Sequence, residues 1–306
     1  MQVTLLAGGT GGTKLAHGFS MLDEVRLSVI VNVADDAEIH GLHVSPDIDA
    51  LLYTLAGLID AERGWGVRGD THAAHEMLAR YGGPPWFVIG DADLATSVER
   101  MRRLRDGATL TDAIAAMAAA LGIQARILPA TDDRLRTRIQ TDAGTLDFQE
   151  YFVHRRQEPE VRGVILDGAE NARPSPSALD AIVGAGFIVI GPSNPIVSIG
   201  PILALAGMRD VLAGAAARKV AVSPLVAGRA LKGPADRMLT SLGHESSALG
   251  VARLYVGVVD AFVIDDADAS LAPSIEALGM KVHVLTTIMT GDAGKAALAA
   301  ALLELA

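Results

Sequence analysis

Cysteine is absent from the 306 residues of the chain, and aromatic residues make up only 4% of it. The lack of cysteine excludes disulfide frameworks, thiolate metal sites and cysteine nucleophiles. Positive charge is also scarce, because 26 Lys and Arg stand against 36 Asp and Glu, which gives a net charge of -10. This balance disfavours a nucleic-acid partner, since binding along a phosphate backbone depends on a basic surface. Catalysis must therefore use Asp, Glu, His, Lys, Ser or Thr.

Long apolar runs are missing as well. The apolar stretches at Phe187–Ile190 and Val251–Val259 are too short or too interrupted to span a membrane as helices. The N-terminus has no basic segment before its short apolar stretch, and glycines follow at once, so it is typical of a first core strand and not of a signal peptide. We expect a cytoplasmic protein with no membrane partner.

Short β-rich runs alternate with Ala- and Leu-rich stretches along most of the chain. Such alternation predicts a mostly parallel sheet with helices on its faces. The predicted strands are Val3–Leu6, Leu27–Val33, Trp86–Ile89, Phe187–Ile190, Lys219–Val222, Ala261–Ile264 and Val282–Leu285. The predicted helices of the first half are Lys14–Met21, Pro46–Leu58, Ala92–Arg105 and Thr111–Leu121.

The segment Arg134–Arg155 interrupts this alternation. Thr and Arg alternate before the turn sequence Asp142-Ala143-Gly144, and Phe148, Tyr151 and Phe152 follow, which is the pattern of a hairpin. We therefore predict an α/β fold, Rossmann-like and doubly wound, with a mostly parallel sheet. It forms a single domain over residues 1–306 with a helical and hairpin-bearing insertion near residues 100–160.

Ligands of open parallel sheets collect at the carboxyl ends of the strands, so the segments that follow strands are the candidate sites. The first of them is glycine-rich and sits before a predicted helix, where backbone N–H groups can face an anion. Its candidate binding residues are Gly9, Thr10, Gly11, Gly12, Thr13 and Lys14. Thr13 and Leu15 break the Walker A pattern, and Lys14 takes the place of the third glycine of the dinucleotide fingerprint. A tight turn without ligand stays the alternative.

The second segment carries four aspartates within fifteen residues, namely Asp35, Asp36, Asp47 and Asp49. Asp35 and Asp36 follow a strand, where they could hold a ribose or bind Mg²⁺ through hard oxygen ligands. Ser45 is expected as the N-cap of a helix with Pro46 at its first position, so Asp47 is expected to complement the positive helix end. Asp49 lies on another face of that helix and should have a different role.

Two histidines and two further segments complete the candidates. His40 and His43 are expected to pack or cap the loop, because no third histidine or cysteine completes a transition-metal set. In Gly90–Thr96 one aspartate is expected to cap the helix that follows. In Gly191–Pro195 two prolines fix the backbone while Ser193 and Asn194 present short polar side chains, which suits a ligand site.

These segments occur in an order that resembles a known family. The motifs are GGTGGTKLAHG, NVADD, HGLHVSPDIDALLYTLAG, GWG, IGDADLAT, LPATDD, FQEYFV and GPSNPIVSIGPIL. Together they are similar to the CofD/FbiA family, the 2-phospho-L-lactate transferases of coenzyme F-420 biosynthesis, over essentially the whole chain. The resemblance implies a Rossmann-like transferase that moves the phospho-acid part of a GDP-activated donor to the deazaflavin Fo. Its products are an F-420-0 type compound and GMP, and Mg²⁺ is required.

The same resemblance implies roles for individual residues. It places contact with Fo on Asp49, and contact with the nucleotide on the segment Gly9–Lys14 and on Ser193 and Asn194. A lysine of archaeal members is replaced by Val88 here. Phosphoryl transfer asks for a metal, anion donors and a group that orients the attacking hydroxyl.

The acids of the second segment are assigned to this chemistry. Asp35, Asp36 and Asp49 are expected to hold Mg²⁺, and Asp36 or Asp49 is expected to orient or deprotonate the ribityl hydroxyl of Fo. A homodimer is the default assembly.

Two other functions are considered beside this one. A nicotinamide-dependent dehydrogenase would need the glycine that Lys14 displaces. A non-catalytic CofD-like regulator that binds nucleotide-sugars or dinucleotides shares the glycine segment, but the sequence AEIHGLHVSPDID after the acidic pair favours the transferase. Phospholactyl, enolpyruvyl and phosphoglyceryl donors differ by very small groups, and the sequence does not distinguish them.

Overall fold

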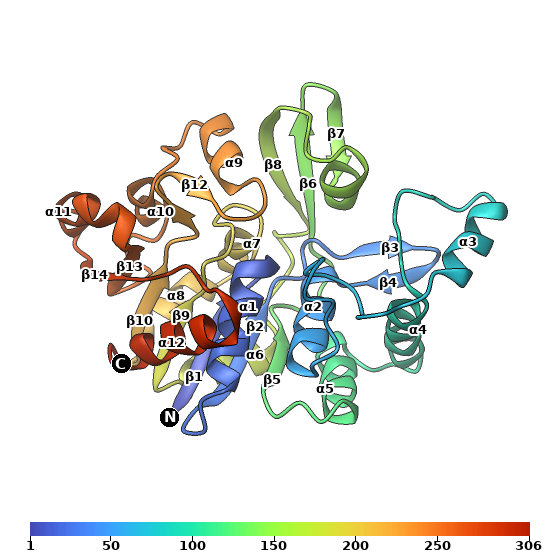
Figure 1. Ribbon diagram of the computed structural model, residues 1–306, viewed down its shortest axis with the longest axis horizontal. Coiled ribbons are helices and arrows are strands. Elements are labelled where there is room, and N and C mark those ends of the chain that lie inside the picture. Colours follow the sequence, from blue (N-terminus) through green and yellow to red (C-terminus); the bar gives the residue numbers. More distant parts are fainter.

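A seven-stranded parallel sheet forms the centre of the computed structural model, which describes residues 1–306 (Figure 1). The order across the sheet is β14-β13-β10-β9-β1-β2-β5, and every neighbouring pair is parallel. In chain order the strands are β1 (Gln2–Ala7), β2 (Arg26–Val31), β5 (Arg126–Pro129), β9 (Phe187–Ile190), β10 (Arg218–Val222), β13 (Ala261–Asp265) and β14 (Lys281–Leu285). The predicted α/β fold is confirmed.

Helices cover both faces of the sheet, because successive strand residues point to opposite sides and both sides are apolar. One face packs on α1 (Gly9–Ser20), α2 (Pro46–Leu55), α5 (Leu110–Ala120) and α12 (Gly291–Leu303). The other packs on α6 (Pro176–Val183), α7 (Ile199–Ala204), α8 (Met208–Gly214), α9 (Ala235–Ser241), α10 (Ala248–Leu254) and α11 (Ala272–Glu276). On β1, for example, Leu5 belongs to the first core and Leu6 to the second, so the arrangement is doubly wound.

A smaller antiparallel sheet, of order β7-β6-β8, stands beyond the carboxyl ends of the main strands. Its strands are β6 (Arg136–Thr141), β7 (Gly144–Asp147) and β8 (Val161–Asp167), and the π-helix η1 (Glu150–His154) connects β7 to β8. The predicted hairpin with its turn at Asp142 and Ala143 is present, whereas β8 was not expected. Figure 1 shows this sheet at the top, beside α9 and opposite the two chain ends.

Seven further elements complete the chain. They are β3 (Ala37–Ile39), β4 (Leu42–Val44), α3 (Ala73–Arg80), α4 (Asp91–Arg105), β11 (Leu225–Val226), β12 (Arg229–Ala230) and the 3₁₀ helix η2 (Asp266–Leu271). The β3–β4 pair is an antiparallel hairpin that extends away from the central sheet toward α3 and α4 (Figure 1).

The strand expected at Trp86–Ile89 does not form, and β5 occupies the place beside β2. Trp86 instead stacks on His154 with ring centroids 5.0 Å apart, and Val88 is 42% exposed, which a core strand does not allow. Two prolines, Pro84 and Pro85, precede this run and supply no N–H groups for a ladder. The apolar run therefore packs as an irregular segment.

None of the helices combines the length and the apolar character that crossing a membrane requires.

Candidate functional site

The strand order reverses between β1 and β9. From β1 the chain builds outward through β2 and β5, and from β9 it builds the other way through β10, β13 and β14. Open α/β sheets bind ligands in the crevice at this point, outside the carboxyl ends of the strands. The glycine-rich segment after β1 and the segment Gly191–Asn194 after β9 pack against each other there, and we call this place at the carboxyl ends of the two strands the switch crevice.

The glycine-rich segment is the N-terminus of a helix and not an open loop. Helix α1 begins at Gly9, five residues before the predicted start at Lys14, so Thr10 to Thr13 lie in its first turns. The N–H groups of a first helical turn lack partners within the helix, which makes this end a site for an anion. Gly9 has φ of +63°, a left-handed conformation that favours glycine at the helix start.

Close packing explains the next two glycines. A Cβ at Gly11 would lie 2.0 Å from the carbonyl oxygen of Pro192, and one at Gly12 would lie 2.6 Å from Oγ of Ser193. The helix N-terminus can therefore approach the loop after β9 only without side chains here. Thr13 is buried and its hydroxyl donates to the Gly9 carbonyl at 2.9 Å, while the Lys14 side chain is exposed on the second turn.

Ser193 and Asn194 fix the other wall of the switch crevice. Oγ of the buried Ser193 accepts the N–H of Gly8 at 3.2 Å. Oδ1 of Asn194 accepts the N–H of Ile196 at 2.9 Å, and its Nδ2 contacts Sδ of Met238 at 3.5 Å. The structure thus brings both predicted residues to the glycine segment, where each already holds backbone or side-chain partners.

Three aspartates gather at the crevice, and we call Asp35, Asp36 and Asp47 the crevice cluster. Oδ2 of Asp36 accepts Oγ–H of Ser45 at 2.8 Å and lies 2.7 Å from Nε2 of His43. Ser45 therefore does not cap α2 through its side chain, as the sequence had suggested, but contacts Asp36. His43 is thereby also engaged with an acid of the cluster.

Asp47 has more than the helix-end role expected of it. Its Oδ1 accepts the N–H of Gly9 at 2.8 Å, and its Oδ2 accepts Nδ2–H of Asn32 at 3.2 Å. This carboxylate therefore ties the N-terminus of α2 to the N-terminus of α1. Sequence reasoning missed that contact, because Gly9 lies 38 residues away in the chain.

Burial raises the pKa of Asp35 well above its usual value, and the charges of Asp47 and Asp36 add to the shift. Burial also raises the pKa of Asp47 to about 6, against the stabilising hydrogen bonds from Gly9 and Asn32. The crevice cluster thus gathers acids in a site that water solvates poorly, which favours their neutral forms until a cation is bound.

Asp49 lies between α2 and α4, within reach of the charge of Asp36. Its Oδ1 forms an ion pair with Nη2 of Arg100, a side chain with no exposed surface, and Nη1 of Arg100 donates to the His43 carbonyl at 2.8 Å. Nearby, the hydroxyl of Tyr53 donates to Asp93 at 2.8 Å. We call these four side chains, Asp49, Arg100, Asp93 and Tyr53, the α2–α4 cluster. Burial raises the pKa of Asp49 to about 7, with Arg100 opposing the shift and Asp93 adding to it.

The predicted magnesium ligands are therefore divided. No three acidic or histidine side chains converge in the arrangement of a ready metal site. Yet one buried oxygen of each predicted ligand has no hydrogen-bond partner, namely Oδ1 of Asp35, Oδ1 of Asp36 and Oδ2 of Asp49. Buried carboxylate oxygens without donors suit a hard divalent cation, and Asp35 with Asp36 fits it best, because Asp49 already has Arg100.

Arg136 is a charged neighbour of the site that sequence reasoning did not single out. It stands at the start of β6, its Nη1 donates to the Leu135 carbonyl at 2.7 Å, and the charges of Asp36 and Asp35 act on it. Burial lowers its pKa, yet no ion pair joins it to either aspartate. A guanidinium held near acids without pairing to them is free to contact an anionic ligand.

The acids of Gly90–Thr96 cap helices in a crossed arrangement. Asp91 accepts the N–H of Ala74 at 2.9 Å and so caps α3, whereas Asp70 accepts the N–H of Ala92 at 2.9 Å at the start of α4. One acid of Gly90–Thr96 therefore caps a helix as expected, but Asp91 caps α3, which precedes it, and not α4, which follows.

Comparison of the sequence with known proteins shows the family to which the chain belongs. Residues 3–284 match the family described as 2-phospho-L-lactate transferase CofD. A phosphoenolpyruvate transferase of Streptomyces griseus is 40% identical, with 100% of this chain and 98% of that protein covered. A 2-phospho-L-lactate transferase of Methanosarcina mazei is 40% identical, with 94% of each chain covered.

A crystal structure of a UPF0052 family protein from Bacillus halodurans has a similar fold, with a TM-score of 0.66 at 18% identity. It covers 99% of this chain, and 98% of that chain is covered in turn. This likeness bears on the fold alone, whereas the sequence relatives share about two fifths of their residues over nearly their full length. The chain is a member of the CofD family, the transferases of coenzyme F-420 biosynthesis.

Proposed function

We propose that this enzyme transfers the phospho-acid part of a GDP-activated donor to the terminal ribityl hydroxyl of Fo. The hydroxyl oxygen forms a bond to the phosphorus that carries the acid, the phosphoanhydride bond breaks, GMP leaves and the hydroxyl proton is lost. The observation that supports this best is the meeting of an anion-binding helix end with the crevice cluster at one point of the sheet.

The diphosphate of the donor binds at the N-terminus of α1. The first-turn N–H groups of α1 beyond Gly9 have no partner within the helix, and the helix dipole favours negative charge at this end. Arg136 supplies a nearby cation for the phosphate or for the carboxylate of the transferred acid. Pro192 and Ser193 lie on the opposite side, close to the helix because Gly11 and Gly12 have no side chains.

Asp35 and Asp36 would hold Mg²⁺ through their unpartnered oxygens. A bound Mg²⁺ offsets the charge of the diphosphate and of the two carboxylates. His43 and Ser45 contact Oδ2 of Asp36 and so fix the orientation of the carboxylate, which leaves Oδ1 for the metal.

Asp49 orients the attacking hydroxyl of Fo in this proposal. Arg100 fixes its Oδ1, and Oδ2 is left without a partner. Its pKa of about 7 lies in the range in which a carboxylate can accept a proton near neutral pH. Val88 is exposed on the segment before α4. Any contact that it makes with Fo is apolar and takes the place of the contact from the lysine of archaeal members.

Mass spectrometry tests the proposal. Purified enzyme is incubated with Fo, Mg²⁺ and, in separate reactions, the phospholactyl, enolpyruvyl and phosphoglyceryl forms of the GDP-activated donor. We expect an F-420-0 type product and an equal amount of GMP with one donor above the others, and loss of both on chelation with EDTA. Binding of nucleotide with no product from any donor would instead indicate a non-catalytic CofD-like protein.

A further inference from the structure

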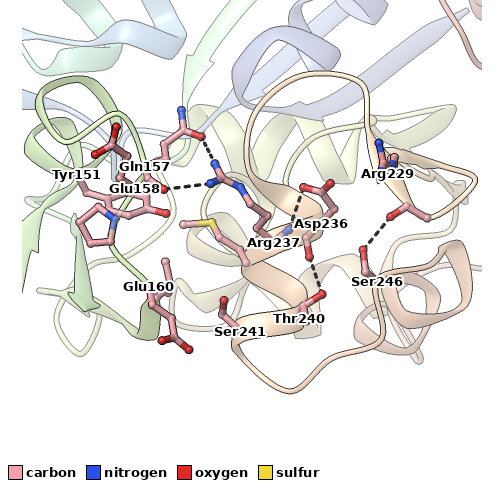
Figure 2. A pocket seen from close by; sticks show the side chains of 14 residues that line it. Tyr151, Gln157, Glu158, Glu160, Arg229, Asp236, Arg237, Thr240, Ser241 and Ser246 are labelled. Carbon is pink, nitrogen blue, oxygen red and sulfur yellow. Dashed lines mark hydrogen bonds between the residues drawn. The ribbon is translucent and has the colours of Figure 1, made fainter. Parts of the chain in front are cut away.

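Two cavities outside the residues assigned so far differ in what their polar side chains already bind. The first, of about 390 Å³, lies between η1 and α9 (Figure 2). Its Arg237 donates to the carbonyl and to Oε1 of Gln157, both at 3.2 Å, and its Ser246 hydroxyl donates to the Gly228 carbonyl at 2.9 Å. These groups are engaged within the protein. The second cavity, of about 470 Å³, has charged side chains that are not.

The second cavity lies at the amino ends of β1, β2 and β5, and we call it the amino-end cavity. The last turn of α6 and the turn between α1 and β2 border it. Figure 1 marks the N-terminus of the chain at this end of the sheet. The switch crevice is at the other end of the strands, about 20 Å away, because β1 has six residues and a strand rises about 3.3 Å per residue. The amino-end cavity is therefore separate from the sites proposed above.

The strand register places a row of polar residues on one face of the sheet at this cavity. Thr4 of β1 pairs with Ser28 of β2, and Ser28 pairs with Arg126 of β5. Alternate residues of a strand share a face. The residues two positions further along these strands belong to the core on the α6 side, namely Leu6, Ile30 and Leu128. The polar row therefore interrupts a face that is otherwise apolar, and the cavity opens over it.

The two hydroxyl groups of this row differ in their partners. Thr4 is buried, and its Oγ1 donates to the Ala181 carbonyl of α6 at 2.7 Å. Ser28 is only 9% exposed and lines the cavity, yet its hydroxyl makes no hydrogen bond within the protein. A buried hydroxyl without a partner costs free energy, whereas an uncovered strand end would carry exposed polar residues only. Ser28 therefore needs a partner that lies in the cavity.

Arg26 and Arg126 bring two guanidinium groups to the same cavity, and neither forms an ion pair. Arg26 lies two residues before Ser28 on β2 and so on the same face of the sheet. Asp180 of α6 is the one acid of the lining, so two arginines against one aspartate give the cavity a charge of +1 in a chain of net charge -10. Unpaired guanidinium groups beside a free hydroxyl are the donors that carboxylates and phosphates bind.

We propose that the amino-end cavity binds a small molecule that carries an oxyanion, a carboxylate or a phosphate, through Arg26, Arg126 and the hydroxyl of Ser28. Its volume is in the range of pockets for small organic ligands, and Gln2 and Asp180 offer acceptors to hydroxyl or amino groups of the same ligand. This second site does not depend on the transferase activity, because it uses no residue of the switch crevice.

Chemical modification of arginine tests the proposal on the full-length protein. Phenylglyoxal reacts with exposed arginine side chains, and mass spectrometry of the peptides reports the extent of reaction at each one. Inorganic phosphate and succinate are the probes, and they distinguish a phosphate from a carboxylate ligand. We expect one of them to protect Arg26 and Arg126 with the same half-maximal concentration. Arg162, an exposed arginine of β8 without an ion pair, is the internal control and should react as before.

Variants show whether one ligand contacts both arginines. In Arg126→Gln, the probe concentration that protects half of Arg26 should rise about tenfold or more, because a charge-assisted contact is lost. In Ser28→Ala it should rise about threefold to tenfold. Ser20→Ala is the matched control and should change nothing, since the Ser20 hydroxyl already donates to the His17 carbonyl at 2.8 Å and has no proton left for an anion.

Three results would overturn the proposal. Equal reaction of Arg26 and Arg126 with and without both probes would leave the cavity to water. Unchanged protection of Arg26 in Arg126→Gln would show that the two arginines do not share a ligand. Protection of Arg136 alone would place the anion in the switch crevice, which supports the donor site and not this one. Melting temperatures confirm that each variant is folded.

Discussion

The crevice cluster and the α2–α4 cluster are built from the same residue type in one stretch of chain, yet their charges are balanced differently. Asp47 and Asp49 are two residues apart, but only Asp49 meets a buried cation, Arg100. The side chains of Asp36 and Asp47 have hydrogen bonds, no acid of the crevice cluster forms an ion pair with Lys or Arg, and Oδ1 of Asp35 and Oδ1 of Asp36 have no partner. The charge of a buried carboxylate that has its own cation is offset within the protein, whereas a buried carboxylate without one keeps its proton or takes a cation from solution.

This difference changes the roles expected from the sequence. Asp47 was assigned only to the helix end, and it proves to join two helix N-termini at the crevice. Asp49 was grouped with the metal ligands, and its Oδ1 pairs with Arg100, which leaves only Oδ2 without a partner. Its proposed contact with Fo stays a prediction that its free Oδ2 allows.

Removing the cation of the α2–α4 cluster should have the largest effect. Arg100→Met leaves Asp49 buried without a counter-charge, so we expect the free energy of unfolding to fall by about 3–5 kcal/mol. Urea denaturation measures it. The double variant Arg100→Met with Asp49→Asn should recover part of the loss, because no buried charge is left. A single variant within about 1 kcal/mol of the wild type would show that the pair is not what joins α2 and α4.

Replacing Asp35 or Asp36 of the crevice cluster by asparagine should lower turnover more than it lowers stability. For Asp35→Asn and Asp36→Asn we expect Mg²⁺-dependent turnover to fall about a hundredfold or more, because a metal contact is lost. Steady-state kinetics across a range of Mg²⁺ concentrations measure it. Glu38→Gln, an exposed acid on β3, is the control and should be neutral. Near-normal turnover of both aspartate variants at saturating Mg²⁺ would contradict the metal assignment.

Two glycines with the same conformation distinguish backbone strain from ligand binding. Gly9 has φ of 63° and Gly41, at the tip of the β3–β4 hairpin, has φ of 71°, and neither lacks space for a methyl group. Either change to alanine should cost about 1–2 kcal/mol of stability. Only Gly9→Ala should also weaken GDP binding, because it disturbs the helix end at the crevice. Equal GDP affinity for both variants in calorimetry would place the diphosphate elsewhere.

A small pH effect is expected far from both clusters, where α1 packs on α12. Burial and the charge of Lys295 lower the pKa of His17 below its usual 6.5, against the pull of Asp292. As the pH falls, His17 therefore takes up a proton in the unfolded chain before it does so in the folded protein. The stability that neutral His17 contributes is lost as the pH falls from about 6.5 toward the pKa of the folded state. His17→Gln should unfold with less dependence on pH in that window. Melting temperatures recorded from pH 8 to 5 check it, and identical slopes would argue against the shift.

The sequence by itself determined the class of fold and the place of the site. Alternating strands and helices require a parallel sheet with two covered faces, and glycines or acids after strands must lie at its carboxyl edge. The hairpin at 136–147 was predictable because its turn and alternation are local signals. The motif order also identified the family, which residues 3–284 then matched.

The tertiary structure decided the rest, because those outcomes depend on residues distant in sequence. Trp86 stacks on His154 instead of joining the sheet, and β5 is the strand that pairs with β2. Arg100 selects Asp49 and not Asp47 as its partner from 51 residues away. Whether a buried acid stays charged, pairs or awaits a metal is set by the groups packed around it, and burial multiplies the strength of each such contact.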